Sequence, residues 1–193
     1  ERAVLEAGAQ DVANALAQTM NEHCRKLNSL MGEGECKMVT PQEAFYEVFD
    51  GPIKVKRVNR TCIDADGHEC FAQHVGLNSN GQYVIWIYSN ASAQDIINSP
   101  WLIVHEIGHA FIWASGWDLP GGNALNDPNG LHPDYQVRSS DAYTEIFADM
   151  FIGWVYGKWE TEPRTSVLTV DGAAKSRYMQ ENMPGMIQAA IGR

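Results

Sequence analysis

The residues from Trp101 to Ser115 form a strongly apolar run that contains two histidines four positions apart. Asn98-Ser99-Pro100 precedes the run as a cap with proline, and Gly116 follows it. These flanks predict a buried helix that ends at the glycine. On a helix, His105 and His109 lie one turn apart and point the same way, so they can bind one metal ion. We expect this helix to carry the chemistry.

The two histidines belong to the pattern His105-Glu106-Ile107-Gly108-His109, or HExxH. Glu106 adjoins the first histidine but points elsewhere on the helix. It can therefore take the proton of a metal-bound water without being a ligand itself. The pattern predicts a Zn²⁺ site in which His105 and His109 are ligands and Glu106 is the general base.

A catalytic zinc site needs a third protein ligand, and the next predicted helix offers one. Ser139 and Ser140 cap this helix, which runs to about residues 154–157. Glu145 and Asp149 lie one turn apart on its surface. We predict that Glu145 is the third metal ligand and that Asp149 accepts the outer N–H of a ligand histidine.

Other polar residues stay open as alternatives in the same half of the chain. His132 and Asp134 lie in a stretch rich in Gly, Pro, Asn and Asp, and they are rival third ligands. We favour Glu145 because a rigid helix positions a ligand better than a loop does. Hydrolysis also needs a donor for the developing oxyanion. The candidates are Tyr143, Tyr135, His132 and Tyr178. Of these, we predict Tyr143 as a catalytic residue.

Together these motifs resemble a known class of enzymes. HEIGH on one helix and a following E-x-x-A-D from Glu145 to Asp149 resemble the gluzincin clan of zinc metallopeptidases, whose ligands are two histidines and a downstream glutamate. The order of motifs is also similar to the ImmA/IrrE group of metallopeptidases. The resemblance covers roughly residues 82–159 and implies a zincin-like fold, a bound Zn²⁺ and a peptide or protein substrate. The sequence after His109 lacks the Gly and third His of metzincins.

The resemblance implies an enzyme that hydrolyses peptide bonds with a zinc-activated water and Glu106 as general base. A catalytically silent zincin-fold module that binds or regulates a partner is the alternative. Retention of Glu106 favours the enzyme, because a binding module has no need for a general base beside both histidines. The strand YVIWIYSN, which begins at Tyr83, resembles the substrate-binding edge strand of such enzymes. Trp86 and Tyr88 could line its side-chain pockets, although ordinary packing roles are the simpler interpretation.

The rest of the pattern predicts an α+β fold with a small antiparallel or mixed sheet, an edge strand packed on the HExxH helix, and further helices. We interpret residues 1–193 as one metallopeptidase domain, in which 1–75 form N-terminal helices and first strands, 82–159 the catalytic core and 160–193 a helical tail. Pro184-Gly185 is expected to end the tail helix. The other predicted elements are a helix over Ala3–Leu30 that ends near Gly32, a helix from the Thr40 capping box to Asp50-Gly51, strands over Ile53–Val58, Phe71–Val75 and Gln82–Ser89 with an Asn80-Gly81 turn, and a tail helix over Ala173–Met183.

Charge and cysteine content narrow the partners and the setting. The 193-residue chain has 24 Asp and Glu against 14 Lys and Arg, a net charge of -10, which disfavours nucleic acid and anionic membranes as partners. No apolar run reaches the roughly 18 residues of a membrane helix. The four cysteines permit two disulfides in three pairings, and free thiols are the alternative. The even count favours a secreted or extracellular setting over a cytoplasmic one.

Overall fold

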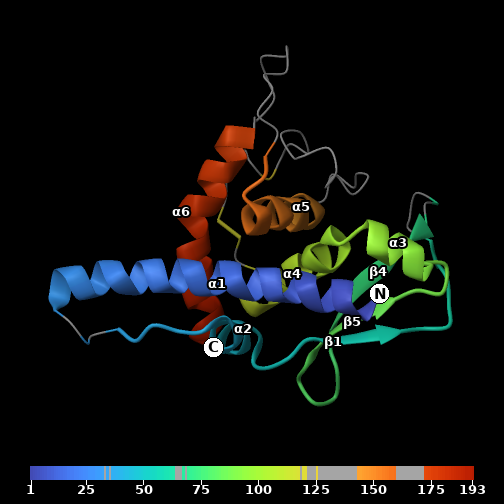
Figure 1. The fold of residues 1–193 in the computed structure, drawn as a ribbon, viewed down its shortest axis with the longest axis horizontal. Coiled ribbons are helices and arrows are strands. Elements are labelled where there is room, and N and C mark those ends of the chain that lie inside the picture. The colour runs from blue at the N-terminus through green and yellow to red at the C-terminus, as the bar shows by residue number, and fades with distance from the viewer. Residues whose placement is uncertain are drawn as a thin grey trace, which may run out of the picture.

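The computed structural model shows an α+β fold in which a central helix lies between a small sheet and a second layer of helices (Figure 1). The structure describes residues 1–32, 34, 36–63, 67, 69–117, 119–120, 125, 143–159 and 172–193. The predicted fold class is confirmed at this level. In chain order the elements are α1 (Arg2–Met31), α2 (Pro41–Phe49), β1 (Lys54–Arg57), β2 (Cys62–Ile63), β3 (Glu69–Cys70), β4 (Ala72–Leu77), β5 (Tyr83–Ile87), α3 (Ala93–Asn98), α4 (Trp101–Ala114), α5 (Tyr143–Tyr156) and α6 (Gly172–Ile191).

The main sheet is mixed and has three strands in the order β1-β5-β4. β4 and β5 pair antiparallel, as the Asn80-Gly81 turn predicts, while β1 pairs with β5 in parallel. β5 is therefore the inner strand, and the prediction that Tyr83–Ser89 is an exposed edge is wrong. The turn specifies the pairing of β4 with β5, but no local pattern shows that the distant β1 occupies the other side of β5. β4 is the edge strand that packs against α4.

Two disulfides fasten the first half of the chain. Cys24 in α1 pairs with Cys36, and Cys62 pairs with Cys70 across the two-stranded β2–β3 ribbon. The second disulfide lies directly before β4, whose first residue is Ala72. The structure thus selects one of the three pairings that the sequence left open, and it leaves no free cysteine.

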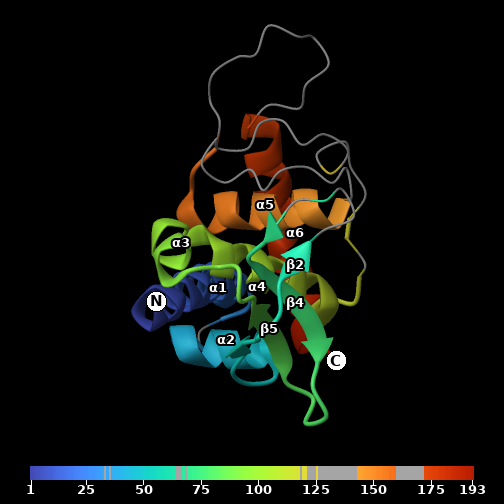
Figure 2. The same cartoon turned by 90° about the vertical axis from the view of Figure 1, so that its right-hand side faces the viewer.

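α4 is the central element, because it packs against α5, the edge strand β4, α1 and α2. Figure 2 shows β4 and β5 on the near side of α4 and α5 above it. Three fully buried phenylalanine rings join α4 to α5: Phe111 stacks on Phe147 at 6.3 Å between ring centroids and lies 5.4 Å from Phe151. Burial of these rings supplies much of the apolar packing that holds the two helices together.

The local capping signals explain where two shorter helices begin. Thr40 and Glu43 form the predicted capping box at the start of α2. Ser92 and Asp95 form a second capping box at the start of α3, a helix that our interpretation of the sequence missed although the Ser-x-x-Asp signal was present.

The C-terminal helix contradicts one prediction. α6 continues through Pro184 to Ile191 instead of ending at Pro184-Gly185. Proline removes one helical hydrogen bond, but the buried side chains of Met183, Met186 and Ile187 pack into the core on both sides of it. Tertiary packing therefore outweighs the local penalty. Among the helices of the described residues, none combines the length and apolar character needed to cross a membrane.

Candidate metal centre

α4 brings the two histidines of HExxH together, as helical geometry requires. The Nε2 atoms of His105 and His109 lie 3.1 Å apart, and the rings meet edge to face. The His105 side chain is 3% exposed and that of His109 is 17% exposed. Both histidines are therefore largely buried, and His109 is the more exposed of the two.

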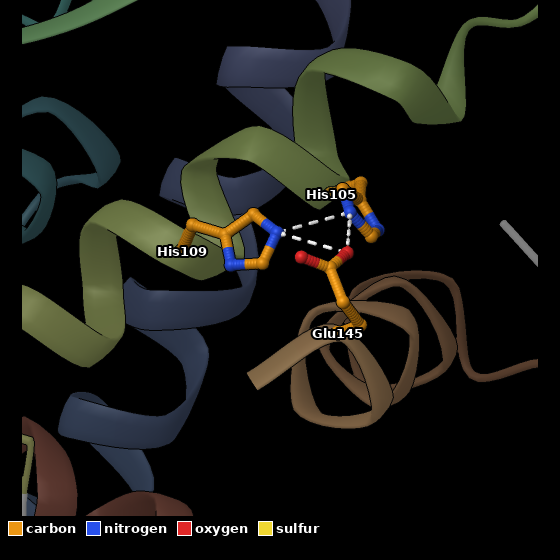
Figure 3. A group of neighbouring side chains, drawn as sticks. All are labelled: His105, His109 and Glu145. Carbon is orange, nitrogen blue, oxygen red and sulfur yellow. Dashed lines mark hydrogen bonds and ion pairs between the residues drawn. The ribbon is translucent and has the colours of Figure 1, made fainter. Parts of the chain in front are cut away.

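Glu145, in the first turn of α5, completes the group (Figure 3). Its Oε2 lies 3.1 Å from His105 Nε2 and 3.3 Å from His109 Nε2. The three atoms form a nearly equilateral triangle. Donors bound at about 2.0–2.1 Å to a tetrahedral zinc ion lie about 3.3–3.4 Å from one another. The His105, His109 and Glu145 group can therefore hold a metal ion.

Asp149 orients one of these ligands. Its Oδ1 lies 2.8 Å from Nδ1 of His105, and both side chains are buried. A carboxylate can only accept, so His105 donates from Nδ1. That bond leaves Nε2 as the nitrogen directed at the metal position. Asp149 thus has the geometry predicted for it.

The charges in this group stabilise one another. Burial lowers the pKa of His105, but hydrogen bonds with Asp149 and Glu145 outweigh it and raise the pKa well above its ordinary value. Burial raises the pKa of Glu145, and hydrogen bonds with both histidines outweigh it in turn, so this pKa is lowered. Without an ion, positive charge on His105 faces the carboxylates of Asp149 and Glu145. A divalent cation would take over that role when it displaces the protons.

A glycine inside HExxH allows α5 to approach α4. A Cβ on Gly108 would lie 3.1 Å from Cα and 3.4 Å from Cβ of Ala148, and 3.2 Å from Cβ of Phe151. Ala148 is one turn after Glu145 and directly precedes Asp149. The absence of a side chain at Gly108 therefore sets the distance at which α5 presents Glu145 and Asp149 to the histidines.

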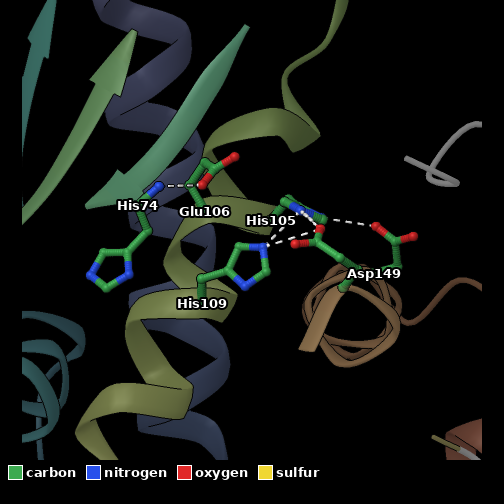
Figure 4. A network of polar contacts seen from close by, with 6 residues as sticks. His74, His105, Glu106, His109 and Asp149 are labelled. Atoms are coloured by element: carbon green, nitrogen blue, oxygen red, sulfur yellow. Dashed lines mark hydrogen bonds and ion pairs between the residues drawn. The ribbon is translucent and has the colours of Figure 1, made fainter. Parts of the chain in front are cut away.

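Glu106 does not join the ligands but points toward the edge strand (Figure 4). Its side chain is buried, and Oε2 accepts a hydrogen bond of 2.5 Å from the backbone N–H of His74 in β4. This N–H points away from β5, on the open side of the edge strand. Among the described residues, the second carboxylate oxygen of Glu106 has no hydrogen-bond partner, and it can accept a proton. β4 thus holds the predicted general base in place.

His74 is a residue that sequence reasoning missed, although a histidine in a strand close to an HExxH helix is a usable signal. No hydrogen-bond partner of its buried Nε2 lies among the described residues. Burial, together with the charge of His109, lowers the pKa of His74 to about 4. The ring of His74 is therefore neutral at physiological pH.

Several predicted residues are not brought into this group. Tyr143 is 47% exposed at the start of α5 and takes part in none of the site contacts described above. Tyr178 donates its hydroxyl to the carbonyl of Pro120 at 2.5 Å, and burial raises its pKa to about 12. The rival ligands His132 and Asp134, the donor candidate Tyr135 and the caps Ser139 and Ser140 lie outside the described residues.

Trp86 and Tyr88, the two aromatic residues assigned to an edge strand, do not lie on an edge strand. Register pairs Gln73 with Trp86, on the opposite face of the sheet from the buried Ile85 and Ile87. The guanidinium carbon of Arg60 lies over the indole of Trp86, 4.0 Å from the centroid of that ring. The Tyr88 hydroxyl donates to Gln73. The alternative in which Trp86 and Tyr88 line pockets along an edge strand falls together with the edge assignment of β5, and ordinary packing roles, the interpretation favoured from the sequence, are left.

No protein-family model, no curated protein and no solved structure matches the chain. The function is therefore argued from the geometry of the site. Three potential ligands converge on one point, an oriented carboxylate stands beside them, and an edge strand runs past both. Such an arrangement can hold a metal ion and accept a proton next to it.

Proposed function

We propose that the protein is a zinc-dependent metallopeptidase with a zincin-like fold. The observation that carries the proposal is the triangle formed by His105, His109 and Glu145. The carboxylate of Glu106 directly follows His105 in the same helix. Two nitrogen donors and one oxygen donor at this spacing favour zinc over the hard cations, which prefer oxygen ligands alone. With three protein ligands, a fourth coordination position stays open, as in catalytic sites.

The residues of the chain have separate tasks in the proposed reaction. His105, His109 and Glu145 would hold the zinc ion, which would supply the Lewis acidity that activates a water molecule and a peptide carbonyl. Glu106 accepts a proton from the attacking water at its carboxylate and can return it to the leaving amine. The His74 N–H restricts rotation of that carboxylate, and Asp149 keeps His105 in the tautomer that binds the ion.

The edge strand β4 offers a way to bind the substrate backbone. An extended peptide can add to an open strand edge through main-chain hydrogen bonds. β4 is a terminal strand of the sheet, and the His74 N–H, which is itself occupied by Glu106, shows that the unpaired edge of β4 lies on the side of Glu106. A peptide that lies along β4 would pass both the general base and the metal position. The proposed substrate is therefore an extended peptide or a protein segment.

Metal content and cleavage test the proposal together. We expect one zinc per chain in the protein purified without a histidine tag, and a clear loss in Glu145→Ala. Glu106→Gln is expected to keep the zinc and lose cleavage of peptides, because an amide cannot accept the proton. A folded wild type that refuses zinc would refute the metal centre. Zinc-loaded wild type that cleaves nothing would instead favour the binding or regulatory module.

A further inference from the structure

The stripe of metal ligands on α4 continues into exposed aromatic residues. His105, His109 and Trp113 follow one another at intervals of four residues, so all three project from the same face of α4. Trp113 is 42% exposed, and Trp117, 47% exposed, packs edge-on against it with 5.1 Å between ring centroids. Two adjoining tryptophans so exposed beside a candidate active site are unusual for a purely structural surface.

The edge strand contributes the other side of this surface. The ring of His74 meets that of Trp113 edge-on at 5.9 Å between centroids. Trp113 also lies over the irregular part of β4, where a Cβ on Gly76 would come within 3.9 Å of its indole. Gly76 has a φ of 85°, a backbone conformation that favours glycine. The aromatic surface therefore lies between the end of α4 and the strand proposed to bind substrate.

We propose that His74, Trp113 and Trp117 form an aromatic subsite that binds an aromatic side chain of the peptide substrate close to the scissile bond. The inference rests on the proposed function, because the metal centre and β4 position the substrate backbone. The substrates of this site would be peptides with Phe, Tyr or Trp next to the cleaved bond.

The geometry favours an aromatic occupant over an aliphatic one. Aromatic rings attract one another in edge-to-face or offset arrangements at about 4.5–7 Å between centroids, beyond the effect of buried area. Trp113 and Trp117 already adopt such an arrangement and still expose large parts of their rings. The imidazole of His74, which meets Trp113 edge-on, adds a second flat ring to this surface.

The test uses zinc-loaded protein and two amino-acid hydroxamates, whose metal-binding group is identical and whose side chains differ. Phenylalanine hydroxamate carries a benzyl group, and leucine hydroxamate carries an isobutyl group. We expect the benzyl compound to bind about threefold to tenfold more tightly to the wild type. In Trp113→Leu and in Trp117→Leu this ratio is expected to fall toward one. Using the ratio within each variant removes any general change in metal affinity.

Tyr46→Leu is the matched control. Tyr46 is 43% exposed, nearly the same as Trp113, but it borders a cavity on the other side of α4 with Ile103 and Ile107. This variant is expected to keep the ratio of the wild type. Trp117→Leu guards against misfolding of Trp113→Leu, since Trp117 lies beyond the end of α4.

The outcomes separate the two proposals. Equal affinities of the two hydroxamates for zinc-loaded wild type would overturn the subsite while the metal centre stands. A ratio that persists in both tryptophan variants would also overturn it, because the preference would then arise elsewhere. Failure of the folded wild type to take up zinc would refute the proposed function and, with it, the subsite that depends on it.

Discussion

Gly108→Ala tests how closely α5 must approach α4 for the metal centre to form. The added Cβ would lie 3.1 Å from the Cα of Ala148 and 3.2 Å from the Cβ of Phe151. Neither atom is at the end of a flexible side chain, so α5 must move by a few tenths of an ångström. Glu145 moves with it, and the spacing of 3.1 and 3.3 Å between its Oε2 and the two histidines changes.

Two opposing terms set the effect on stability. Replacing glycine by alanine inside a helix stabilises it by about 1 kcal/mol. Overpacking a dense contact costs about 1–3 kcal/mol. We therefore expect Gly108→Ala to lower the free energy of unfolding of the metal-free protein by about 1 kcal/mol, with a span from zero to about 2 kcal/mol. Urea unfolding in the presence of a chelator measures this difference.

Metal affinity is the sharper readout. Because a ligand helix is displaced, we expect zinc affinity to fall about tenfold, the low end of the effect of disturbing the support of a metal ligand. Competition with a chromophoric chelator measures the dissociation constant. Gly185→Ala is the control, since that position lies in α6 with no atom within 4 Å of the added Cβ. Gly185→Ala is expected to raise the free energy of unfolding by about 0.5–1 kcal/mol and to have the zinc affinity of the wild type. If Gly108→Ala behaves like Gly185→Ala, the close approach of α5 to α4 does not position the third ligand.

Further predictions concern the support of the site and of one helix. Asp149→Asn removes the charge that orients His105, so zinc affinity measured by chelator competition is expected to fall about tenfold to a hundredfold; an unchanged value would contradict the orienting role. Because hydrogen bonds with Asp149 and Glu145 outweigh burial and raise the pKa of metal-free His105, protons compete with the ion below that pKa. Zinc affinity is therefore expected to increase from about pH 6 to about pH 8, and a flat profile would refute this competition. Thr40→Ala removes the capping box that Thr40 forms with Glu43. In urea unfolding, the free energy of unfolding is expected to fall by about 1 kcal/mol, while zinc affinity stays unchanged. An unchanged free energy of unfolding would show that the cap does not stabilise the protein.

The part of the site that lies within one helix could be predicted from the sequence. The spacing of His105 and His109 places both on one face of α4, and the structure has their Nε2 atoms 3.1 Å apart. The apolar residues around them also predict that this helix is buried. Helical periodicity alone is enough for both conclusions.

The third ligand required one further assumption, that two helices distant in sequence meet. Glu145 and Asp149 share a face of α5, which the sequence indicates, but their approach to His105 depends on packing between Phe111, Phe147 and the small residue Gly108. The sequence singled out these carboxylates because their spacing suits a ligand and its partner. The distances that make them a ligand set follow only from the packed helices.

The order of the strands was beyond local reasoning, and it changes how the site works. A turn signal identifies neighbouring strands, but the parallel pairing of β1 with β5 joins residues about thirty positions apart. That pairing covers the second side of β5, which leaves β1 and β4 as the edge strands of the sheet. Of these two, β4 is the strand that carries His74, whose N–H reaches Glu106 and whose ring adjoins Trp113. The packing of β4 on α4 positions the general base and one wall of the proposed aromatic subsite, and local sequence signals do not predict that packing.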